Sequence, residues 1–255
     1  MKVVILAGGF GTRLSEHTHS IPKPMLKIGD KPIIWHIMRI YAYFGYTDFI
    51  IALGYKSEEI KKYFLEYKLL NSNFTLNIGT GKIISHDHEG IEWNVTLVDT
   101  GLETMTGGRV KRLEKYLDSK PFFLTYGDGL ADINIKDLLN FHKNNKKIAT
   151  LTSVRPSARF GELEINSDLV TSFEEKPQLQ KGWINGGFFV FQPEIFSYIN
   201  GDETMLEREP LESLVEKKQL NAFKHFGMWQ SMDTKREYEL LQKLWIDNKA
   251  FWLPN

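Results

Sequence analysis

Four charged side chains that lie far apart in the sequence have the chemical types that bind phosphate groups and a metal ion. Arg13 and Lys23 supply cations, and Asp128 and Asp233 supply carboxylates. Guanidinium and ammonium groups bind phosphate oxygens, whereas carboxylate oxygens bind hard cations such as Mg²⁺. The chain has no cysteine, so disulfides, thiolate metal sites and cysteine nucleophiles are excluded.

A glycine-rich segment precedes Arg13. The apolar run 3–7 predicts a strand buried on both faces, and Gly8, Gly9 and Gly11 follow it. Glycines let the backbone bend sharply and bring N–H groups close to an anion. The segment lacks both the third small residue of the dinucleotide motif and the lysine of the P-loop, so it matches neither of these two phosphate-binding patterns.

Lys23 lies between Pro22 and Pro24, ten residues after Arg13. Proline fixes its own φ and biases the residue before it toward extended geometry. We therefore expect an extended, stiff backbone at Lys23 and a side chain that is held in one direction.

Asp128 lies between two glycines, directly after the apolar segment 121–126, which predicts a buried strand. In open α/β sheets ligands bind beyond the carboxyl ends of the strands, so Asp128 is placed to hold Mg²⁺. An aspartate that only bonds to the backbone of its own turn fits this context equally well.

Asp233 precedes a predicted helix over 235–248. Thr234 and Glu237 have the spacing of a capping box for this helix. Since Thr234 can cap the helix, Asp233 is available as a second metal carboxylate once Asp128 is accepted as the first.

A second glycine pair, Gly107 and Gly108, precedes Arg109. Bare backbone beside a guanidinium suits the close approach of a flat base or of a phosphate. A helix that begins here with Thr106 as its N-cap is about as compatible with the local sequence, and it does not exclude the first interpretation.

Strands and helices alternate along the chain, which is typical of a doubly wound parallel sheet. The pattern predicts an α/β, three-layer Rossmann-like fold with a mostly parallel mixed sheet, helices on both faces and a projecting β-hairpin over 75–78 and 82–85. Predicted strands are 3–7, 48–53, 94–100, 121–126, 149–154 and 183–191. Predicted helices are 31–41, 58–67, 110–117, 135–143 and 235–248. We expect one domain over 1–255, with halves at about 1–134 and 135–234 followed by the last helix.

Three other polar positions are expected to be structural. His36 is predicted to pack within its helix, because no second ligand-type residue recurs at a helical spacing. Asp132 is predicted to cap the helix over 135–143. Residues 86–89 (HDHE) could suggest a metal site, but an exposed polar turn explains them without a metal.

Charge and length limit the function further. Basic and acidic residues number 32 each, giving a formal net charge of zero, so a nucleic acid or an anionic membrane is not expected as the main partner. The first apolar run is too short for a signal peptide, and no segment approaches the length of a membrane span. These features predict a soluble cytoplasmic protein.

The glycine segment 6–14 (LAGGFGTRL) followed by 22–25 (PKPM) resembles the signature of the sugar-1-phosphate nucleotidyltransferases. Members of this family join a nucleoside triphosphate to a sugar phosphate and release pyrophosphate. Segments 127–129 (GDG), 173–177 (FEEKP) and 232–233 (MD) match later family motifs in the same order.

The resemblance implies roles for individual residues. Arg13, Lys23 and Asp128 are implied to be catalytic, and Asp128 and Asp233 are implied to bind Mg²⁺. It implies that the nucleotide is bound by Leu6, Ala7, Gly8, Gly9, Phe10, Gly11, Thr12, Arg13, Lys23, Thr104, Thr106, Arg109 and Gly127. For the sugar phosphate it implies Gly161, Glu175, Lys176, Asn185, Gly186 and Gly187. By residue chemistry alone, Glu175 and Lys176 are by default an exposed charge pair.

Other segments, such as 98–101 (VDTG), 105–109 (MTGGR) and 185–189 (NGGFF), are similar to those of family members that use CTP and glucose 1-phosphate. That resemblance implies formation of CDP-glucose and pyrophosphate, as a step toward the deoxyhexoses of surface polysaccharides, and it implies a homo-oligomer, as a hexamer. The alternative is a related nucleotidyltransferase that uses another pyrimidine nucleoside triphosphate or another hexose 1-phosphate.

Two other function classes remain as alternatives. A glycosyltransferase of similar architecture would usually carry an Asp-x-Asp metal motif, but here the aspartates are Asp128 and Asp132. A nucleotide-sensing subunit without catalysis would have no need for Lys23, Asp128 and Asp233 together.

Overall fold

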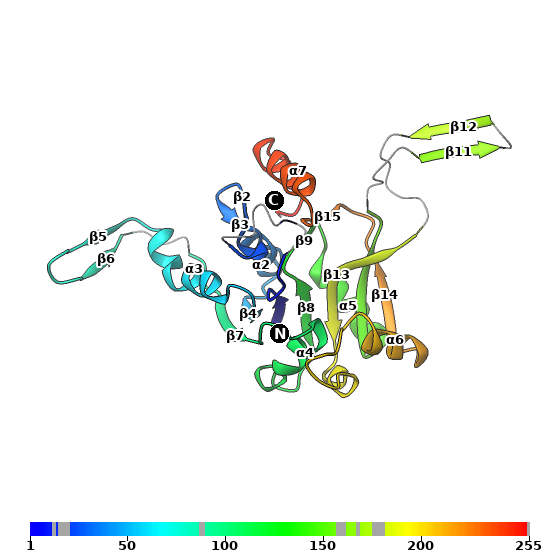
Figure 1. The fold of residues 1–255 in the computed structure, drawn as a ribbon, viewed down its shortest axis with the longest axis horizontal. Coiled ribbons are helices and arrows are strands. Elements are labelled where there is room, and N and C mark those ends of the chain that lie inside the picture. Colours follow the sequence, from blue (N-terminus) through cyan, green and yellow to red (C-terminus); the bar gives the residue numbers. More distant parts are fainter. Residues whose placement is uncertain are drawn as a thin grey trace.

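The computed structural model describes residues 1–11, 14, 21–86, 90–156, 162–166, 169–174 and 182–253. Its centre is a seven-stranded sheet (Figure 1). From one edge to the other, the strands are β14 (Leu220–Lys224), β10 (Ala149–Val154), β13 (Ile184–Phe191), β8 (Phe122–Tyr126), β1 (Val3–Leu6), β4 (Asp48–Leu53) and β7 (Asn94–Asp99).

The sheet is mixed but mostly parallel. β8, β1, β4 and β7 run parallel to one another, and β14 runs parallel to β10. Only β13 is antiparallel to its two neighbours, β8 and β10. The parallel strands therefore share one edge at which their carboxyl ends meet, which is where open α/β sheets bind ligands.

Alternate residues of β1 pack into two separate cores. Val3 and Ile5 belong to one buried cluster, and Val4 and Leu6 belong to the other. Successive side chains of a strand point to opposite faces, so a strand that is apolar at every position needs cover on both sides.

Helices supply this cover. The first cluster includes residues of α2 (Ile33–Tyr43), α3 (Ser57–Leu70), α5 (Ile135–Asn145) and α7 (Lys235–Ile246). The second includes residues of α4 (Thr106–Arg112), η4 (Pro193–Tyr198) and α6 (Glu209–Glu216). The predicted three-layer α/β fold, with helices on both faces of a mostly parallel mixed sheet, is confirmed. The division into halves near residue 134 stays a prediction.

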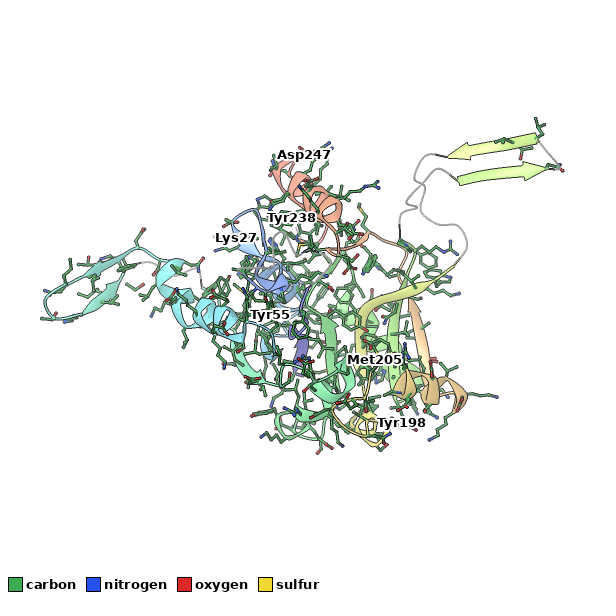
Figure 2. The ribbon with its side chains drawn as sticks, viewed as in Figure 1. Lys27, Tyr55, Tyr198, Met205, Tyr238 and Asp247 are labelled. Carbon is green, nitrogen blue, oxygen red and sulfur yellow. The ribbon has the colours of Figure 1, made fainter. Side chains whose placement is uncertain are left out.

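Short two-stranded sheets lie around this core. They are β2 (Lys27–Ile28) with β3 (Lys31–Pro32), β5 (Phe74–Leu76) with β6 (Ile83–Ser85), β9 (Gly129–Ala131) with β15 (Trp229–Ser231), and β11 (Glu162–Asn166) with β12 (Leu169–Glu174). The hairpins β5–β6 and β11–β12 project from the body in different directions, and the side chains of β5–β6 stand clear of it (Figures 1 and 2). The projecting hairpin predicted over 75–78 and 82–85 is thus present.

Two local predictions are wrong. Asn134, rather than Asp132, caps α5, because its side chain accepts hydrogen bonds from two N–H groups of the first turn. Asp132 instead lies 2.8 Å from Nε2 of His225. Lys23 is not extended: it begins the 3₁₀ helix η2 (Lys23–Met25), where Pro24 fits because an N–H is not required in a first turn.

The helix predicted over 110–117 begins earlier, at Thr106, and it is followed by the 3₁₀ helix η3 (Glu114–Tyr116). Met105, rather than Thr106, is at its N-cap position. His36 is buried as predicted: Nε2 lies 3.0 Å from the carbonyl oxygen of Ile28, and Nδ1 accepts from the indole N–H of Trp252. In the part of the chain that the structure describes, no helix combines the length and apolar character needed to cross a bilayer.

Candidate functional site

A cavity of about 640 Å³ opens at the carboxyl ends of β1 and β8. One wall is the glycine segment after β1, and others come from the segments 102–109, 126–128 and 229–233. The predicted site residues that line it are Leu6, Ala7, Gly8, Gly9, Phe10, Gly11, Lys23, Thr104, Thr106, Arg109, Gly127, Asp128, Asn185 and Asp233. One hollow therefore brings together most of the predicted site.

Seven predicted residues are not among those that line this cavity. Thr12, Arg13, Gly161, Glu175 and Lys176 lie outside the described residues. Gly186 and Gly187 lie in β13 next to the wall. A Cβ atom at Gly186 would lie 2.7 Å from Val154, and one at Gly187 would lie 2.7 Å from the ring of Tyr126. Close packing thus explains why glycine stands at both positions, and their contact with a sugar stays a prediction.

The three glycines of the segment after β1 have three different environments. Gly11 has φ +63°, which favours glycine. A Cβ atom at Gly8 would lie 2.3 Å from the guanidinium of Arg109. A Cβ atom at Gly9 would meet none of the described residues within 4 Å. Their packing does not require glycine at Gly9, which is consistent with a ligand that approaches its backbone.

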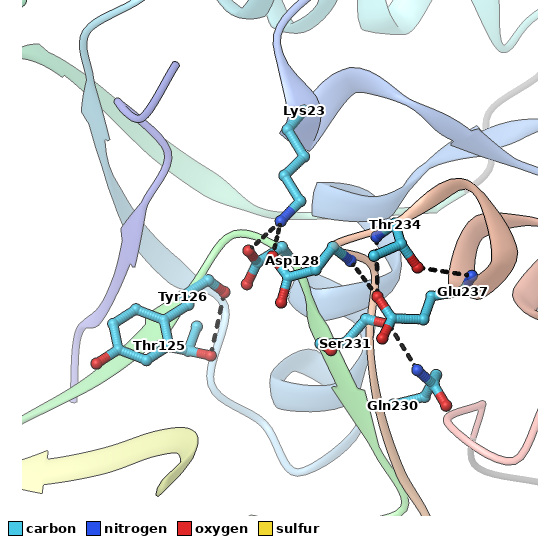
Figure 3. Close-up of polar contacts among 9 residues, drawn as sticks. Lys23, Thr125, Tyr126, Asp128, Gln230, Ser231, Thr234 and Glu237 are labelled. Carbon is cyan, nitrogen blue, oxygen red and sulfur yellow. Dashed lines mark hydrogen bonds and ion pairs between the residues drawn. The ribbon is translucent and has the colours of Figure 1, made fainter. Parts of the chain in front are cut away.

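Lys23, Asp128 and Asp233 meet at this cavity. The Nζ atom of Lys23 lies 2.6 Å from Oδ2 of Asp128 and 2.7 Å from Oδ1 of Asp233 (Figure 3). The Lys23 side chain is 12% exposed, and the two carboxylates are 31% and 28% exposed. The two carboxylates thus converge on one cation and remain accessible from the cavity.

Pairing between two short strands brings the carboxylates together. β9 directly follows Asp128 and pairs antiparallel with β15, placing Gly129 opposite Ser231. The N–H of Met232 then donates to the carbonyl of Asp128, at 2.9 Å. The side chain of Asp233, the next residue, is carried to the same place as that of Asp128.

The helix cap after β15 also fixes Asp233. Oε2 of Glu237 accepts from the backbone N–H groups of Asp233 and Thr234, at 2.8 and 2.9 Å. Thr234 Oγ1 accepts from the N–H of Glu237, so the predicted capping box is present (Figure 3). The cap that starts α7 therefore also holds the backbone of a candidate metal ligand.

Burial alone would lower the pKa of the Lys23 ammonium. The charges and hydrogen bonds of Asp128 and Asp233 outweigh this effect and raise that pKa above its ordinary value. Lys23 is therefore a cation at neutral pH and is suited to contact with phosphate oxygens.

The donor set fits Mg²⁺ bound together with a substrate. Among the described residues, no group of three or more His, Asp or Glu side chains could hold a metal alone. Asp128 and Asp233 supply two carboxylates that already share one cation. Mg²⁺ typically takes one or two carboxylates and completes its shell with phosphate oxygens and water. These two residues would hold the metal, and the nucleotide would supply further oxygens.

Arg109 borders the cavity, but its side chain is turned onto the protein. The terminal nitrogens of its guanidinium donate to carbonyl groups of Gly8, Leu53, Gly101 and Leu102 and to the hydroxyl of Thr100. Burial lowers the pKa of this group from its ordinary value, yet it stays charged. The predicted approach of a base or a phosphate to Arg109 stays a prediction, and the geometry favours a structural role for its terminal nitrogens.

A hydrogen-bonded network that the sequence did not indicate lies in the wall of the cavity. Glu207 accepts from the hydroxyls of Tyr126 and Thr106, each at 2.6 Å. Asn185 donates to the oxygen of Tyr126 at 3.2 Å. Burial, together with the charge of Glu207, raises the pKa of Tyr126, which therefore remains protonated. The network fixes the amide of Asn185 in the cavity wall.

Some lining residues were not predicted. They are Pro24, Leu102, Glu103, Met105, Tyr126, Trp229 and Ser231. Tyr126 ends β8, so the rule that ligands bind beyond the carboxyl ends of strands could have indicated it. Trp229 donates its indole N–H to the carbonyl of Gly186 at 2.8 Å, a long-range contact that no local pattern marks.

A family model described as nucleotidyl transferase matches residues 2–243. The chain is 51% identical over 254 residues to glucose-1-phosphate cytidylyltransferase of Salmonella typhimurium, covering 99% of this chain and 98% of the relative. It is 42% identical over 253 residues to a probable glucose-1-phosphate cytidylyltransferase of Bacillus subtilis, with 99% of each chain covered.

Solved structures share the fold. The crystal structure of HddC from Yersinia pseudotuberculosis has a TM-score of 0.70 at 23% identity, covering 96% of this chain and 99% of that one. A UDP-glucose pyrophosphorylase complexed with UDP-glucose also has a TM-score of 0.70, at 17% identity, with 97% and 98% covered. At these identities the likeness concerns the fold alone.

Proposed function

The chain belongs to the nucleotidyl transferase family, and on that premise we propose that it transfers a cytidylyl group from CTP to α-D-glucose 1-phosphate. The products would be CDP-glucose and pyrophosphate. Relatives at 51% and 42% identity over nearly the whole chain carry the name of this activity. The observation that carries the proposal is the convergence of Lys23, Asp128 and Asp233 on the cavity beside the glycine segment.

The proposed step is an in-line displacement at phosphorus. A phosphate oxygen of glucose 1-phosphate attacks the α-phosphorus of CTP, and a new P–O bond forms. The bond from the α-phosphorus to the oxygen that bridges to the β-phosphate breaks, and pyrophosphate leaves with the electron pair. A phosphate monoester is largely dianionic at neutral pH, so the nucleophile needs no general base. The protein must instead neutralise charge and align two anions that repel each other.

The described residues fit these tasks. Gly9 offers backbone that a triphosphate can approach, and Gly8 and Gly11 shape the segment around it. The ammonium of Lys23 would leave the carboxylates and stabilise charge on the α-phosphate. Asp128 and Asp233 would hold Mg²⁺, which when bound neutralises charge on phosphate oxygens.

Other roles rest on the family resemblance. Thr12 would complete the triphosphate cradle, and Arg13 would hold the departing β,γ portion. Lys176, with Glu175 beside it, would anchor the sugar phosphate. Asn185, whose amide the Tyr126 network fixes, would contact the sugar.

The proposed setting is the cytoplasm, as a homo-oligomer. The hairpin β5–β6 carries exposed apolar side chains, including Ile78, which is 91% exposed, and Ile84, which is 50% exposed. Such a hairpin is marginally stable alone, so we propose that it contacts another subunit. Light scattering after size-exclusion chromatography tests this, and a monomer at micromolar concentration would contradict it.

The deciding experiment measures pyrophosphate release with each nucleoside triphosphate against a panel of sugar 1-phosphates. CTP with glucose 1-phosphate is expected to give the highest kcat/KM. In the reverse direction, CDP-glucose and pyrophosphate should return CTP, which a glycosyltransferase would not do. Absence of turnover with every pair would contradict the proposal and favour a sensing subunit.

A further inference from the structure

The guanidinium of Arg109 connects the ends of three neighbouring strands. Its Nη1 atom lies 3.0 Å from the carbonyl oxygen of Leu53 at the end of β4 and 2.7 Å from that of Gly101 beyond β7. Its Nη2 atom lies 3.1 Å from the carbonyl oxygen of Gly8 beyond β1. Arg109 is 5% exposed. One side chain from α4 thus holds together the three loops at the edge where ligands bind.

No N–H group on the two terminal nitrogens is left for a ligand. Nη2 also donates to the carbonyl of Leu102 at 3.0 Å, and Nη1 also donates to the hydroxyl of Thr100 at 2.8 Å. Five protein acceptors therefore surround these two nitrogens, which carry four N–H groups between them. A base read by the terminal nitrogens of Arg109 would have to break these hydrogen bonds.

The carbonyl of Gly8 is saturated. It accepts from Arg109 and also from the backbone N–H of Tyr55, at 3.2 Å, and a carbonyl oxygen has two lone pairs. Tyr55 follows β4 (Figure 2). In a trans peptide the C=O and the next N–H are antiparallel, so the N–H of Gly9 is directed away from the guanidinium. Its orientation is thus set before any anion arrives.

Two glycines leave room for the planar guanidinium. A Cβ atom at Gly8 would lie 2.3 Å from Nη1 of Arg109, and one at Gly54 would lie 2.6 Å from the same atom. A lysine ammonium has a single nitrogen, so it cannot reproduce contacts made by two separate nitrogens to four carbonyl groups.

We propose that Arg109 is a positioning residue, which presets the Gly8–Gly9 peptide for the triphosphate of CTP rather than reading the cytosine base. This inference rests on the proposed function, because it concerns the same nucleotide. A preset loop loses less conformational freedom on binding, so Arg109 contributes to triphosphate affinity without touching the ligand.

The test compares CTP, UTP and CMP binding by titration calorimetry in wild type and Arg109→Lys. The matched control is Arg112→Lys, in the same helix, where the arginine pairs with Asp202 at the surface. Arg109→Lys is expected to weaken CTP binding about tenfold or more, to leave CMP within threefold and to keep the CTP-to-UTP ratio. The control is expected to match wild type.

Two results would overturn the inference. Equal losses for CMP and CTP with a reduced CTP-to-UTP ratio would make Arg109 a base reader, and unchanged CTP affinity would remove it from the site. If wild type binds CTP and forms CDP-glucose, the proposed function stands in either case. If wild type does neither, the proposed function itself fails.

A substitution at Gly8 tests the same inference without a change at residue 109, so the test does not depend on whether the Arg109→Lys variant folds. Gly8→Ala places a methyl group where the guanidinium lies, so it should displace Arg109 and reproduce the selective loss of CTP affinity. In Arg109→Ala the space is vacant, so adding Gly8→Ala should weaken CTP binding less than threefold further. Fully additive losses would contradict the inference. Circular dichroism and Tm verify that each variant is folded.

Discussion

The Nζ atom of Lys23 lies 2.6 Å from Oδ2 of Asp128, although 105 positions of sequence separate the two residues. The same nitrogen lies 2.7 Å from Oδ1 of Asp233. Two carboxylates this close would repel each other without a cation between them. Lys23 is that cation in the structure, and in the proposed reaction it turns toward phosphate.

Loss of Lys23 should therefore affect turnover strongly. Lys23→Ala is expected to lower kcat about 10²- to 10³-fold, the scale for removing one preorganised electrostatic group. Initial rates of pyrophosphate release at saturating CTP, glucose 1-phosphate and Mg²⁺ measure this. Lys27→Ala is the control, because Lys27 is exposed on β2. A kcat near that of wild type would exclude Lys23 from the mechanism.

Metal binding to the nucleotide-free protein should compete with Lys23. The ammonium occupies the carboxylate oxygens that a divalent cation would use, so removing it should tighten Mn²⁺ binding. Lys23→Met is expected to lower the Kd for Mn²⁺ about tenfold, measured from the electron paramagnetic resonance signal of free Mn²⁺. Adding Asp128→Asn to Lys23→Met should abolish this gain in Mn²⁺ affinity. Equal Mn²⁺ affinities in wild type and Lys23→Met would contradict the shared use of these oxygens.

Local pattern was enough to predict six of the seven strands of the central sheet, all except the edge strand β14. In β1, the sequence shows apolar residues at every position, and the structure buries Val3 and Ile5 on one face and Val4 and Leu6 on the other. The predicted capping box of Thr234 and Glu237 was also readable, because both partners lie within four residues. Such features depend on neighbours along the chain.

Contacts between distant segments were not readable. The pairing of β9 with β15 joins segments about one hundred residues apart, and neither strand exceeds three residues. Glu207 gave no local signal, since its partners Tyr126 and Thr106 come from other elements. Arg109 was recognised beside two glycines, but the direction of its side chain depends on three loops that meet only in the fold.

The cap of α7 should link stability to the site. Glu237→Ala removes the acceptor for the N–H groups of Asp233 and Thr234, and the loss of such a cap costs about 1 kcal/mol. For a chain of this size that lowers Tm by about 2–4 °C. Glu237→Gln retains a side-chain oxygen that can accept these hydrogen bonds, so its Tm should lie close to that of wild type.

Thr234→Ala separates the two effects of this cap. It removes the hydroxyl that accepts from Glu237 but keeps the carboxylate on the N–H of Asp233. We expect a lower Tm with an unchanged Mg²⁺ requirement in Thr234→Ala, whereas Glu237→Ala should also raise the Mg²⁺ concentration for half-maximal rate. An identical Mg²⁺ requirement in both variants would show that the cap does not position Asp233.

Buried His36 should make the fold sensitive to acid. Burial lowers its pKa to about 4, although the carbonyl of Ile28 favours the protonated form. Nδ1 accepts a hydrogen bond from the indole N–H of Trp252. A proton on Nδ1 would therefore point toward this N–H, and the hydrogen bond would be lost. The unfolded chain takes up this proton near pH 6.5, before the folded protein does. The stabilisation from neutral His36 is therefore complete above pH 6.5 and decreases by about 1.4 kcal/mol per pH unit between pH 6.5 and about pH 4.

His36→Gln isolates this dependence. Carboxylates and the other histidines titrate in both proteins, so their effects cancel in the difference between the two unfolding free energies. Urea unfolding between pH 4 and pH 8 is expected to show wild type more stable at neutral pH, with the difference shrinking as the pH falls. A difference that stays constant over this range would mean that His36 titrates equally in the folded and unfolded states, and that its contacts with Ile28 and Trp252 do not hold it neutral.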